Sequence, residues 1–195
     1  MPSMRSHRPH GFTLIEMAIA VAIAGVMLGV GGSSLQSALN TTRLDAAASE
    51  FNAALHLAQG EAIRSNRSVV LCRSDDMSRC TSGNGSWKGW LVFVDSDGNG
   101  QRDATEEVVR NGTIDNPLLA RGSASIAAQD NRIAFQPDGR ARGSEGLAAF
   151  SGALEFCVAS THPGDNVREV GLAAGGRTSM SKSSSGGVCA APAAV

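Results

Sequence analysis

The chain has 195 residues, of which 42% are hydrophobic and only 4% aromatic, and its formal net charge is −1. This length and composition suit one folded domain plus one further element. The balance of 17 basic and 18 acidic residues excludes an overall attraction to nucleic acid, so any nucleic-acid site would have to be a local basic surface.

The first patterned segment is a long apolar run that follows a short basic start. Residues 1–11 include Arg5 and Arg8 but no acidic residue, and residues 12–32 carry a single charge, Glu16. The run has the length that a helix needs to cross a hydrocarbon core of about 30 Å. The basic flank predicts that the N-terminus stays in the cytoplasm and that the rest of the chain lies outside.

A secretory signal peptide and a plain transmembrane anchor are the two alternative interpretations of this run. The run is longer than the apolar region of a signal peptide, and no clear cleavage site follows it. A plain anchor leaves Glu16 unexplained, because an unpaired carboxylate inside an apolar segment is costly. The position of Glu16 therefore indicates a function.

The residues at the start of the run, from Gly11 through Phe12, Thr13, Leu14 and Ile15 to Glu16, resemble the signature of type IV pilins and type II secretion pseudopilins. The resemblance implies that a prepilin peptidase cuts between Gly11 and Phe12 and that the new amine of Phe12 is methylated. It also implies that Glu16 neutralises the N-terminus of a neighbouring subunit during assembly. Such an ion pair is strengthened in a low-dielectric layer.

A second pattern, from Asn40 to Asn66, places apolar residues at helical spacing with charged residues on the other face. We therefore expect one long helix over 12–66. Its first part (12–32) would be transmembrane, its second part would lie on a sheet, and a bend is expected near Gly29–Ser34.

After Asn66 the pattern changes to short apolar runs separated by turn residues, which is typical of β-strands. The run Trp87–Asp95 is apolar nearly throughout, which predicts a central strand and places Trp87 and Trp90 in the core. Residues 179–187 and the tail after Cys189 are expected to be mobile. The expected strands are Ser68–Arg73, Trp87–Asp95, Glu106–Arg110, Ala124–Ala128, Arg132–Gln136, Ala149–Ala159 and Val167–Ala173.

The order of several of these pieces resembles the GspH/FimT domain of minor pilins and minor pseudopilins. The pieces that carry the resemblance are 58–64, 68–73, 87–95 with the acidic hairpin that runs to Glu107, 133–139, 156–158 and 167–177. The resemblance implies an α+β, type IV pilin-like fold, in which a long N-terminal helix packs on a domain of two antiparallel sheets. The expected parts are a leader peptide (1–11), the pilin helix (12–66) and a periplasmic β domain with a mobile C-terminal tail (67–195).

The same resemblance implies a structural role, as a subunit that helps to assemble or prime a type IV pilus or a type II secretion pseudopilus. The implied partners are other pilins, the prepilin peptidase and the inner-membrane assembly platform. The protein would be a single-pass protein of the bacterial inner membrane before it enters the filament. The four histidines are scattered without a spacing typical of catalysis, so we expect no enzyme activity.

The four cysteines, Cys72, Cys80, Cys157 and Cys189, contain no C-x-x-C pair, so disulfides are expected rather than a zinc site. Four cysteines allow three pairings. We prefer Cys72 with Cys80, which closes a short loop after a strand, and Cys157 with Cys189, which ties the C-terminal tail to a strand.

An acidic segment matches the calcium-loop formula position by position, with Gly100 at the sharp turn. An EF-hand loop is flanked by helices, however, whereas this segment connects two strands, and a hairpin tip also favours Asp, Asn and Gly. The sequence leaves two interpretations of this segment, a calcium-binding loop and a plain hairpin. No other cofactor is expected. The candidate ligands are Asp95, Asp97, Asn99, Gln101, Asp103 and Glu106.

A basic region near the C-terminus contains Arg168, Arg177 and Lys182, with no acidic residue after Glu169. Gly176 and Arg177 resemble part of a DNA-binding motif in the FimT branch, which implies DNA capture during uptake as an alternative function. The second arginine of that motif is missing here, and non-specific DNA binding needs several phosphate contacts. The alternative is an ordinary solvated tail.

Overall fold

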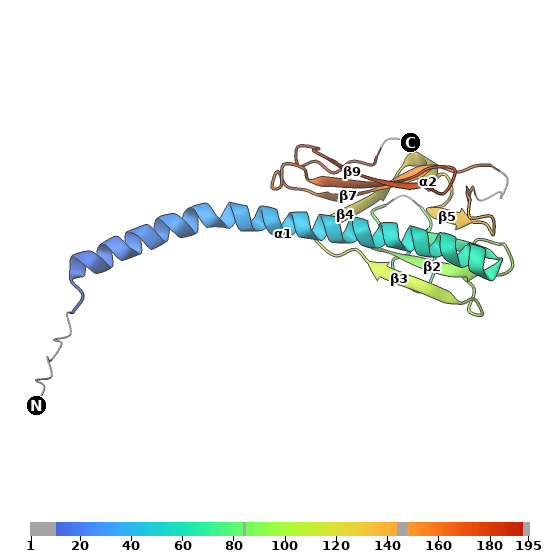
Figure 1. The fold of residues 1–195 in the computed structure, drawn as a ribbon, viewed down its shortest axis with the longest axis horizontal. Coiled ribbons are helices and arrows are strands. Elements are labelled where there is room, and N and C mark those ends of the chain that lie inside the picture. Colours follow the sequence, from blue (N-terminus) through green and yellow to red (C-terminus); the bar gives the residue numbers. More distant parts are fainter. Residues whose placement is uncertain (1–10, 84, 144–147, 193–195) are drawn as a thin grey trace, which may run out of the picture.

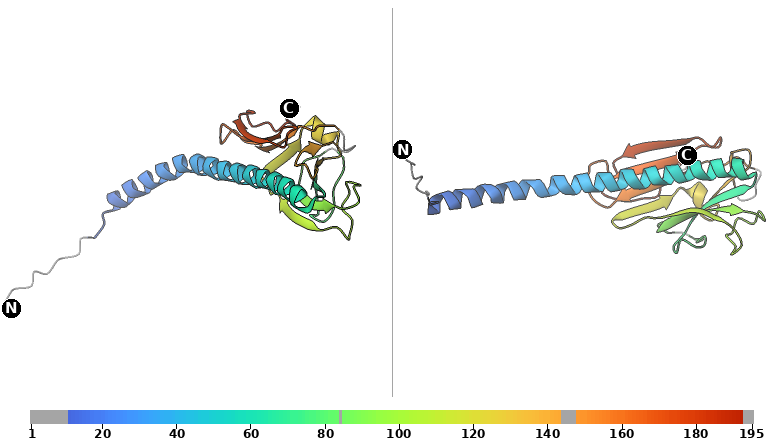
Figure 2. Two further views of the ribbon diagram at one scale, coloured as in Figure 1. Left: turned by 45° about the vertical axis from the view of Figure 1, so that its right-hand side comes forward. Right: turned by 60° about the horizontal axis from the view of Figure 1, so that its bottom comes forward.

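The long helix α1 (Leu14–Ser65) is the element to which the rest of the fold is attached. The computed structural model describes residues 11–83, 85–143 and 148–192, and the side chains of 27–33 lie outside this description. The helix begins after Thr13, whose side chain accepts a hydrogen bond from a backbone N–H, and it ends at Asn66, which has a left-handed φ of 53°. The expected continuous helix is therefore confirmed, and Figures 1 and 2 show a gentle curve along it rather than a sharp bend near Gly29–Ser34.

Only the C-terminal half of α1 packs on the β domain. In Figure 1 the N-terminal half projects away from both sheets. The C-terminal half buries one side, which confirms its amphipathic pattern, because its buried apolar residues recur about once per helical turn. They are Leu44, Ala48, Phe51, the adjacent Ala54 and Leu55, Ala58 and Ala62.

Two antiparallel sheets form the β domain, as expected. The five-stranded sheet has the order β3 (Val108–Thr113), β2 (Gly89–Asp95), β1 (Ser68–Arg73), β5 (Arg132–Phe135) and β6 (Ala141–Arg142). The four-stranded sheet has the order β4 (Leu118–Gly122), β7 (Gly152–Val158), β8 (Val167–Leu172) and β9 (Thr178–Ser183). Strand β2 is buried at every position and internal, but the centre of its sheet is β1.

The two sheets meet at α1, which fills the angle between them (Figure 1). Phe51 of α1 makes edge-to-face contacts with Trp87 at 6.0 Å and with Phe156 of β7 at 5.8 Å. Trp87 precedes β2 and Phe156 lies in the other sheet, so one helical side chain joins both layers of the core. Trp87 and Trp90 are both buried, as predicted.

The predicted strand Ala124–Ala128 is wrong, because this segment is the short helix α2 (Ala124–Ala127). Only Ile126 is buried in α2, so a run of small residues gave no alternation from which to distinguish a helical turn from a strand. Strands β4, β6 and β9 were not expected. The side chains of β9 are nearly all exposed, and its position is fixed instead by backbone pairing with β8 along its whole length.

Both preferred cysteine pairs are present as disulfides, Cys72–Cys80 and Cys157–Cys189. The second, together with hydrogen bonds of 2.9 Å between Asn166 and Ser185, holds the segment after β9 against the four-stranded sheet. The expectation that residues 179–187 are mobile is therefore wrong, because strand pairing and this clamp fix them. Residues 193–195 lie outside the described part of the chain.

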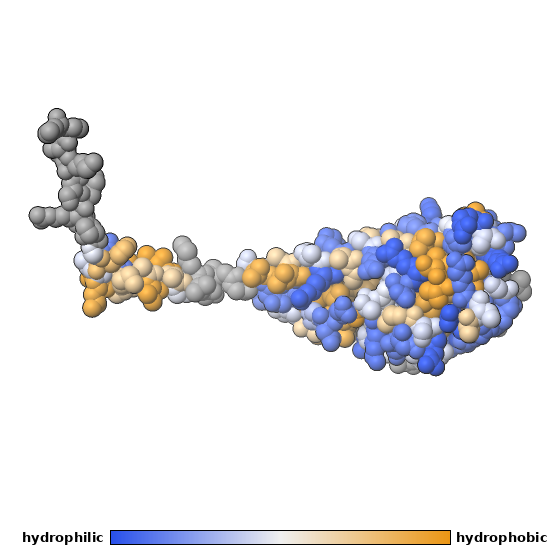
Figure 3. Space-filling view, turned by 90° about the horizontal axis from the view of Figure 1, so that it is seen from below, coloured by the Kyte–Doolittle hydropathy of each residue, from blue (hydrophilic) through white to orange (hydrophobic). Residues whose placement is uncertain are grey.

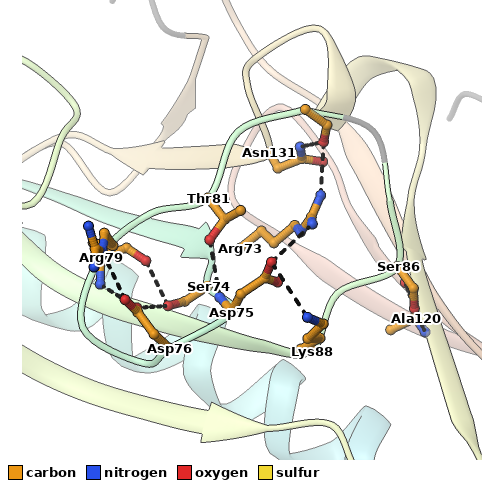
Figure 4. Close-up of polar contacts among 11 residues, drawn as sticks. Arg73, Ser74, Asp75, Asp76, Arg79, Thr81, Ser86, Lys88, Ala120 and Asn131 are labelled. Carbon is orange, nitrogen blue, oxygen red and sulfur yellow. Dashed lines mark hydrogen bonds and ion pairs between the residues drawn. The ribbon is translucent and has the colours of Figure 1, made fainter.

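The loop between β1 and β2 is ordered by a second set of polar contacts (Figure 4). Arg73, whose side chain is 9% exposed, donates to the carbonyl of Gly83 at 2.9 Å and lies 3.5 Å from the carboxylate of Asp75. Lys88 lies 4.0 Å from the same carboxylate. These contacts fix the loop that the Cys72–Cys80 disulfide closes.

Candidate assembly site and neighbouring ligand sites

The junction between Gly11 and Phe12 lies outside any helix or strand, just before α1. Both residues are exposed, and Phe12 keeps 81% of its surface accessible. A Cβ atom added to Gly11 would meet no other atom within 4 Å. The structure therefore leaves this peptide bond accessible, with no packing of the folded domain around it.

Glu16 closes the first turn of α1 in a capping box with Thr13. The Glu16 backbone N–H donates to the Thr13 hydroxyl at 3.3 Å, and the Thr13 N–H donates to the Glu16 carboxylate at 3.4 Å. The carboxylate is thus turned back to the residue that follows Phe12. It lies at the end of the helix where cleavage after Gly11 would create an amine.

The N-terminal part of α1 exposes an unusual amount of apolar surface. Figure 3 shows it as a largely hydrophobic segment, in contrast to the mixed surface of the β domain. At 100° per residue these positions are distributed around the helix rather than along one side, and a helix that is apolar all round is normally buried. The exposed fractions are Phe12 81%, Leu14 89%, Ile15 69%, Met17 56%, Ile19 55%, Val21 68%, Ile23 54% and Val26 69%.

Among the residues that the structure describes, no helical stretch is both long and apolar enough to cross a membrane. The expected span, 12–32, includes 27–32, whose side chains lie outside the description.

The acidic loop after β2 brings together three of the six candidate calcium ligands. Oxygen atoms of Asp95, Asp97 and Glu106 lie within 4.8 Å of one another. The Asp95 carboxylate accepts hydrogen bonds from the N–H groups of Gly98 at 2.9 Å and Gly100 at 3.1 Å, which wrap the loop around it. Burial, and then the nearby charge of Glu106, raise the pKa of the Asp95 carboxyl.

The remaining candidates line the exposed side of the same loop. The Asn99 amide donates to Asp97 at 2.7 Å and to Asp103 at 3.3 Å, so it links the clustered carboxylates to Asp103. Gln101 donates its N–H to the Asn99 oxygen. The loop fits a cation in its donor chemistry, since hard cations prefer carboxylate and carbonyl oxygens, and calcium binding stays a prediction.

We predict that calcium stabilises the full-length chain and that Asp95→Asn removes this effect. At a calcium concentration ten times its dissociation constant, the gain would be about 1.4 kcal/mol. Because the folded state raises the pKa of Asp95, this group contributes stability below its ordinary value of 3.8 and loses it as the pH rises through the folded pKa. Calcium should therefore stabilise the chain more at neutral pH than near pH 4.

Thermal unfolding with calcium or with chelator is the measurement, and Asp115→Asn is the control because Asp115 is an exposed acid in another loop. A melting temperature that responds to neither calcium nor chelator would remove the calcium prediction.

The three basic residues proposed to contact DNA do not form one surface. Arg168 is only 3% exposed and donates to Asp45 of α1 at 2.6 Å, so its expected role is wrong: the guanidinium is already used inside the domain. Lys182 lies 3.4 Å from the same carboxylate, whereas Arg177 is exposed. The hydrogen bond from Arg168 lowers the pKa of the Asp45 carboxyl, and the buried position of Arg168 makes this contact part of the packing between α1 and the four-stranded sheet.

Sequence reasoning missed a basic side chain on the other sheet, Arg132 of β5. Its side chain is 12% exposed and lines a cavity beside the acidic loop. An arginine inside a strand gives no local signal of burial, because the residues that cover Arg132 come from another part of the chain.

Two family models match the sequence of this chain. A family model described as type II transport protein GspH matches residues 47–176, and one described as the prokaryotic N-terminal methylation motif matches residues 6–32. No curated protein matches the sequence.

Two solved structures have a similar fold. The type IV minor pilin FimU of Pseudomonas aeruginosa has a TM-score of 0.51 and 20% identity, over 72% of this chain and 90% of FimU. The minor pseudopilin EpsH of the Vibrio cholerae type 2 secretion system has a TM-score of 0.50 and 13% identity, over 72% of this chain and 97% of EpsH. The fold and the two family matches together show that this chain belongs to the GspH family of type II transport proteins and begins with a prokaryotic N-terminal methylation motif.

Proposed function

We propose that the chain is a minor pilin or pseudopilin subunit that acts in the assembly or priming of a type IV pilus or type II secretion pseudopilus. The observation that carries the proposal is the exposed apolar stem of α1, which begins directly after the accessible Gly11–Phe12 bond and carries the Glu16 carboxylate in its first turn. The apolar side chains of this stem do not pack on the core of the β domain. They therefore contribute to stability only when other molecules cover them.

The energetics favour a filament of bundled helices. Burying a single large aliphatic or aromatic side chain contributes about 1.5–3 kcal/mol, so the stem offers many times the energy of one contact. Glu16 then determines how neighbouring stems align, because a carboxylate in an apolar layer is stable only beside a cation. The methylated amine of Phe12 from an adjacent subunit is the cation that this proposal assigns.

The route to the filament follows from the same residues. The chain would be inserted in the bacterial inner membrane through residues 12–32, with the N-terminus in the cytoplasm and the β domain in the periplasm. Prepilin peptidase would remove residues 1–11 and methylate Phe12, and the inner-membrane platform would then pass the subunit to other pilins. The role is structural rather than catalytic, and DNA uptake stays a separate prediction.

Gly11→Val tests the proposal at its first step. Since a side chain at Gly11 meets open space, the substitution leaves the fold intact and affects only recognition of the cleavage site. We expect the variant to keep residues 1–11 and to be absent from sheared filaments, as seen by immunoblot of membrane and filament fractions.

Gly60→Ala is the matched control, because a Cβ atom at Gly60 also meets nothing within 4 Å. It should be processed and incorporated like the unmodified chain. Normal incorporation of uncut Gly11→Val protein would contradict the proposed route.

A further inference from the structure

A cavity of about 330 Å³ lies on the face of the five-stranded sheet that is turned away from α1. Its floor includes Val70 and Ala134, which belong to a small apolar cluster separate from the main core. The acidic loop covers one side through Asn99 and Gly100. The cavity is therefore independent of the helix that is proposed to build the filament.

Arg132 is the side chain that makes this cavity chemically unusual. It is 12% exposed, and its Nε atom is buried without a hydrogen-bond partner in the described part of the chain. The nearest acidic atom, on Asp130, is 3.9 Å from Nη1, which is beyond hydrogen-bond distance. Of the three guanidinium nitrogens, Nε is the one that is buried without a partner, and an unpaired buried N–H group is unfavourable.

The position of Arg132 is fixed by its surroundings. Within β5 it pairs with Cys72 of β1, and its Nη1 and Cδ atoms lie 3.9 and 4.0 Å from where a Cβ atom on Gly100 would be. Gly100 has a φ of 68°, a conformation that favours glycine, so the loop can turn closely over the arginine. The backbone of Arg132 is thus fixed by the sheet, and its guanidinium lies beside Gly100 and borders the cavity.

The other polar side chains around the cavity include an amide, a second arginine and one acid. Gln136 directly follows β5 and lines the cavity, and Arg142 of β6 pairs with Ala134 and forms an ion pair with Asp138 at 3.0 Å. The acidic wall residue, Asp95, already accepts hydrogen bonds from two backbone N–H groups. Its charge is therefore partly compensated within the loop.

We propose that this cavity binds a small organic anion through the guanidinium of Arg132, which offers parallel N–H donors to carboxylate or phosphate oxygens. The planar fork of arginine matches these groups. The cavity volume lies at the lower end of the range for small-molecule sites. The small side chain of Ala134 leaves room for the guest between the two arginines.

Isothermal titration of the full-length chain in non-ionic detergent, at constant ionic strength, tests this proposal. The probes are succinate, inorganic phosphate and the uncharged analogue succinamide. We expect binding of succinate or phosphate but not of succinamide, and a loss of about tenfold or more in affinity for Arg132→Gln, since hydrogen bonds to charged groups are lost. Binding of succinate alone would assign a carboxylate ligand, and binding of phosphate alone a phosphate ligand.

Two further variants separate a binding role from a folding role. Ala134→Leu fills the floor of the cavity without changing any charge, and it should also abolish binding. Arg121→Gln removes an exposed arginine from the other sheet and should bind like the unmodified chain. Absence of anion binding, equal binding of succinamide, or unchanged affinity in either Arg132→Gln or Ala134→Leu would overturn the proposal.

Discussion

Replacement of Glu16 by Gln is expected to leave cleavage after Gly11 intact and to lower incorporation into filaments by at least about tenfold. Removing one partner of an ion pair in an apolar environment costs about 3–5 kcal/mol, and each 1.4 kcal/mol corresponds to a factor of about ten. Gln also serves as the third residue of a capping box. The start of α1 should therefore keep its structure, so that the substitution tests the charge alone.

Glu50→Gln is the matched control on the same helix. Glu50 lies 3.7 Å from Arg110 and is 43% exposed, so its ion pair is a surface contact of small energy. Both variants should appear in the membrane fraction as processed chains, and only Glu16→Gln should be depleted from sheared filaments. Equal amounts of the two in the filament fraction would show that the Glu16 carboxylate has no role in assembly.

Arg168→Ala is expected to lower the free energy of unfolding by about 3 kcal/mol. This is the largest loss that we expect from replacing a buried charged side chain of the domain. The variant loses the 2.6 Å hydrogen bond to Asp45 and leaves the carbonyl groups of Asp165 and Val167 without their donor. This loss is placed at the low end of the range for breaking a buried ion pair, because the Asp45 side chain is 42% exposed and solvent screens its charge. Denaturant titration of the full-length chain in detergent measures the change.

The pH dependence identifies the source of this loss. Arg168 lowers the pKa of Asp45 below its ordinary value of 3.8, so the pair stabilises the fold above that value and the contribution disappears as the pH falls through the folded pKa. The difference between Arg168→Ala and the unmodified chain should therefore shrink in strong acid. Lys182→Ala, at a 58% exposed partner of the same carboxylate, should cost less than about 1 kcal/mol. A loss for Lys182→Ala as large as that for Arg168→Ala would contradict this assignment.

The helix and the apolar strands could be predicted from sequence because their signals are local. The apolar spacing over Asn40–Asn66 gave the packed half of α1, and the runs around Val70 and Phe93 gave strands β1 and β2. Strand β9 has no such signal, because its side chains are nearly all exposed and its main contact is the backbone pairing with β8. The small residues of α2 likewise suit either a turn of helix or a strand.

The contacts of the charged side chains, in contrast, could not be predicted from sequence. Arg168 was expected to meet DNA, but its partner Asp45 is 123 residues away in sequence, and no local pattern reveals a contact at that separation. Arg132 was missed for the same reason, since the Gly100 loop that covers it is brought there by the sheet. The Gly11–Glu16 signature, in contrast, is contiguous in sequence, so it could be recognised without knowledge of the fold.

The mass of the chain purified from the membrane and filament fractions tests the central claim most directly. The account predicts a mature chain that begins at Phe12 and carries one methyl group on its amine, with Glu16 four residues after the new terminus. A filament chain that keeps residues 1–11, or that begins at any other residue, would contradict it.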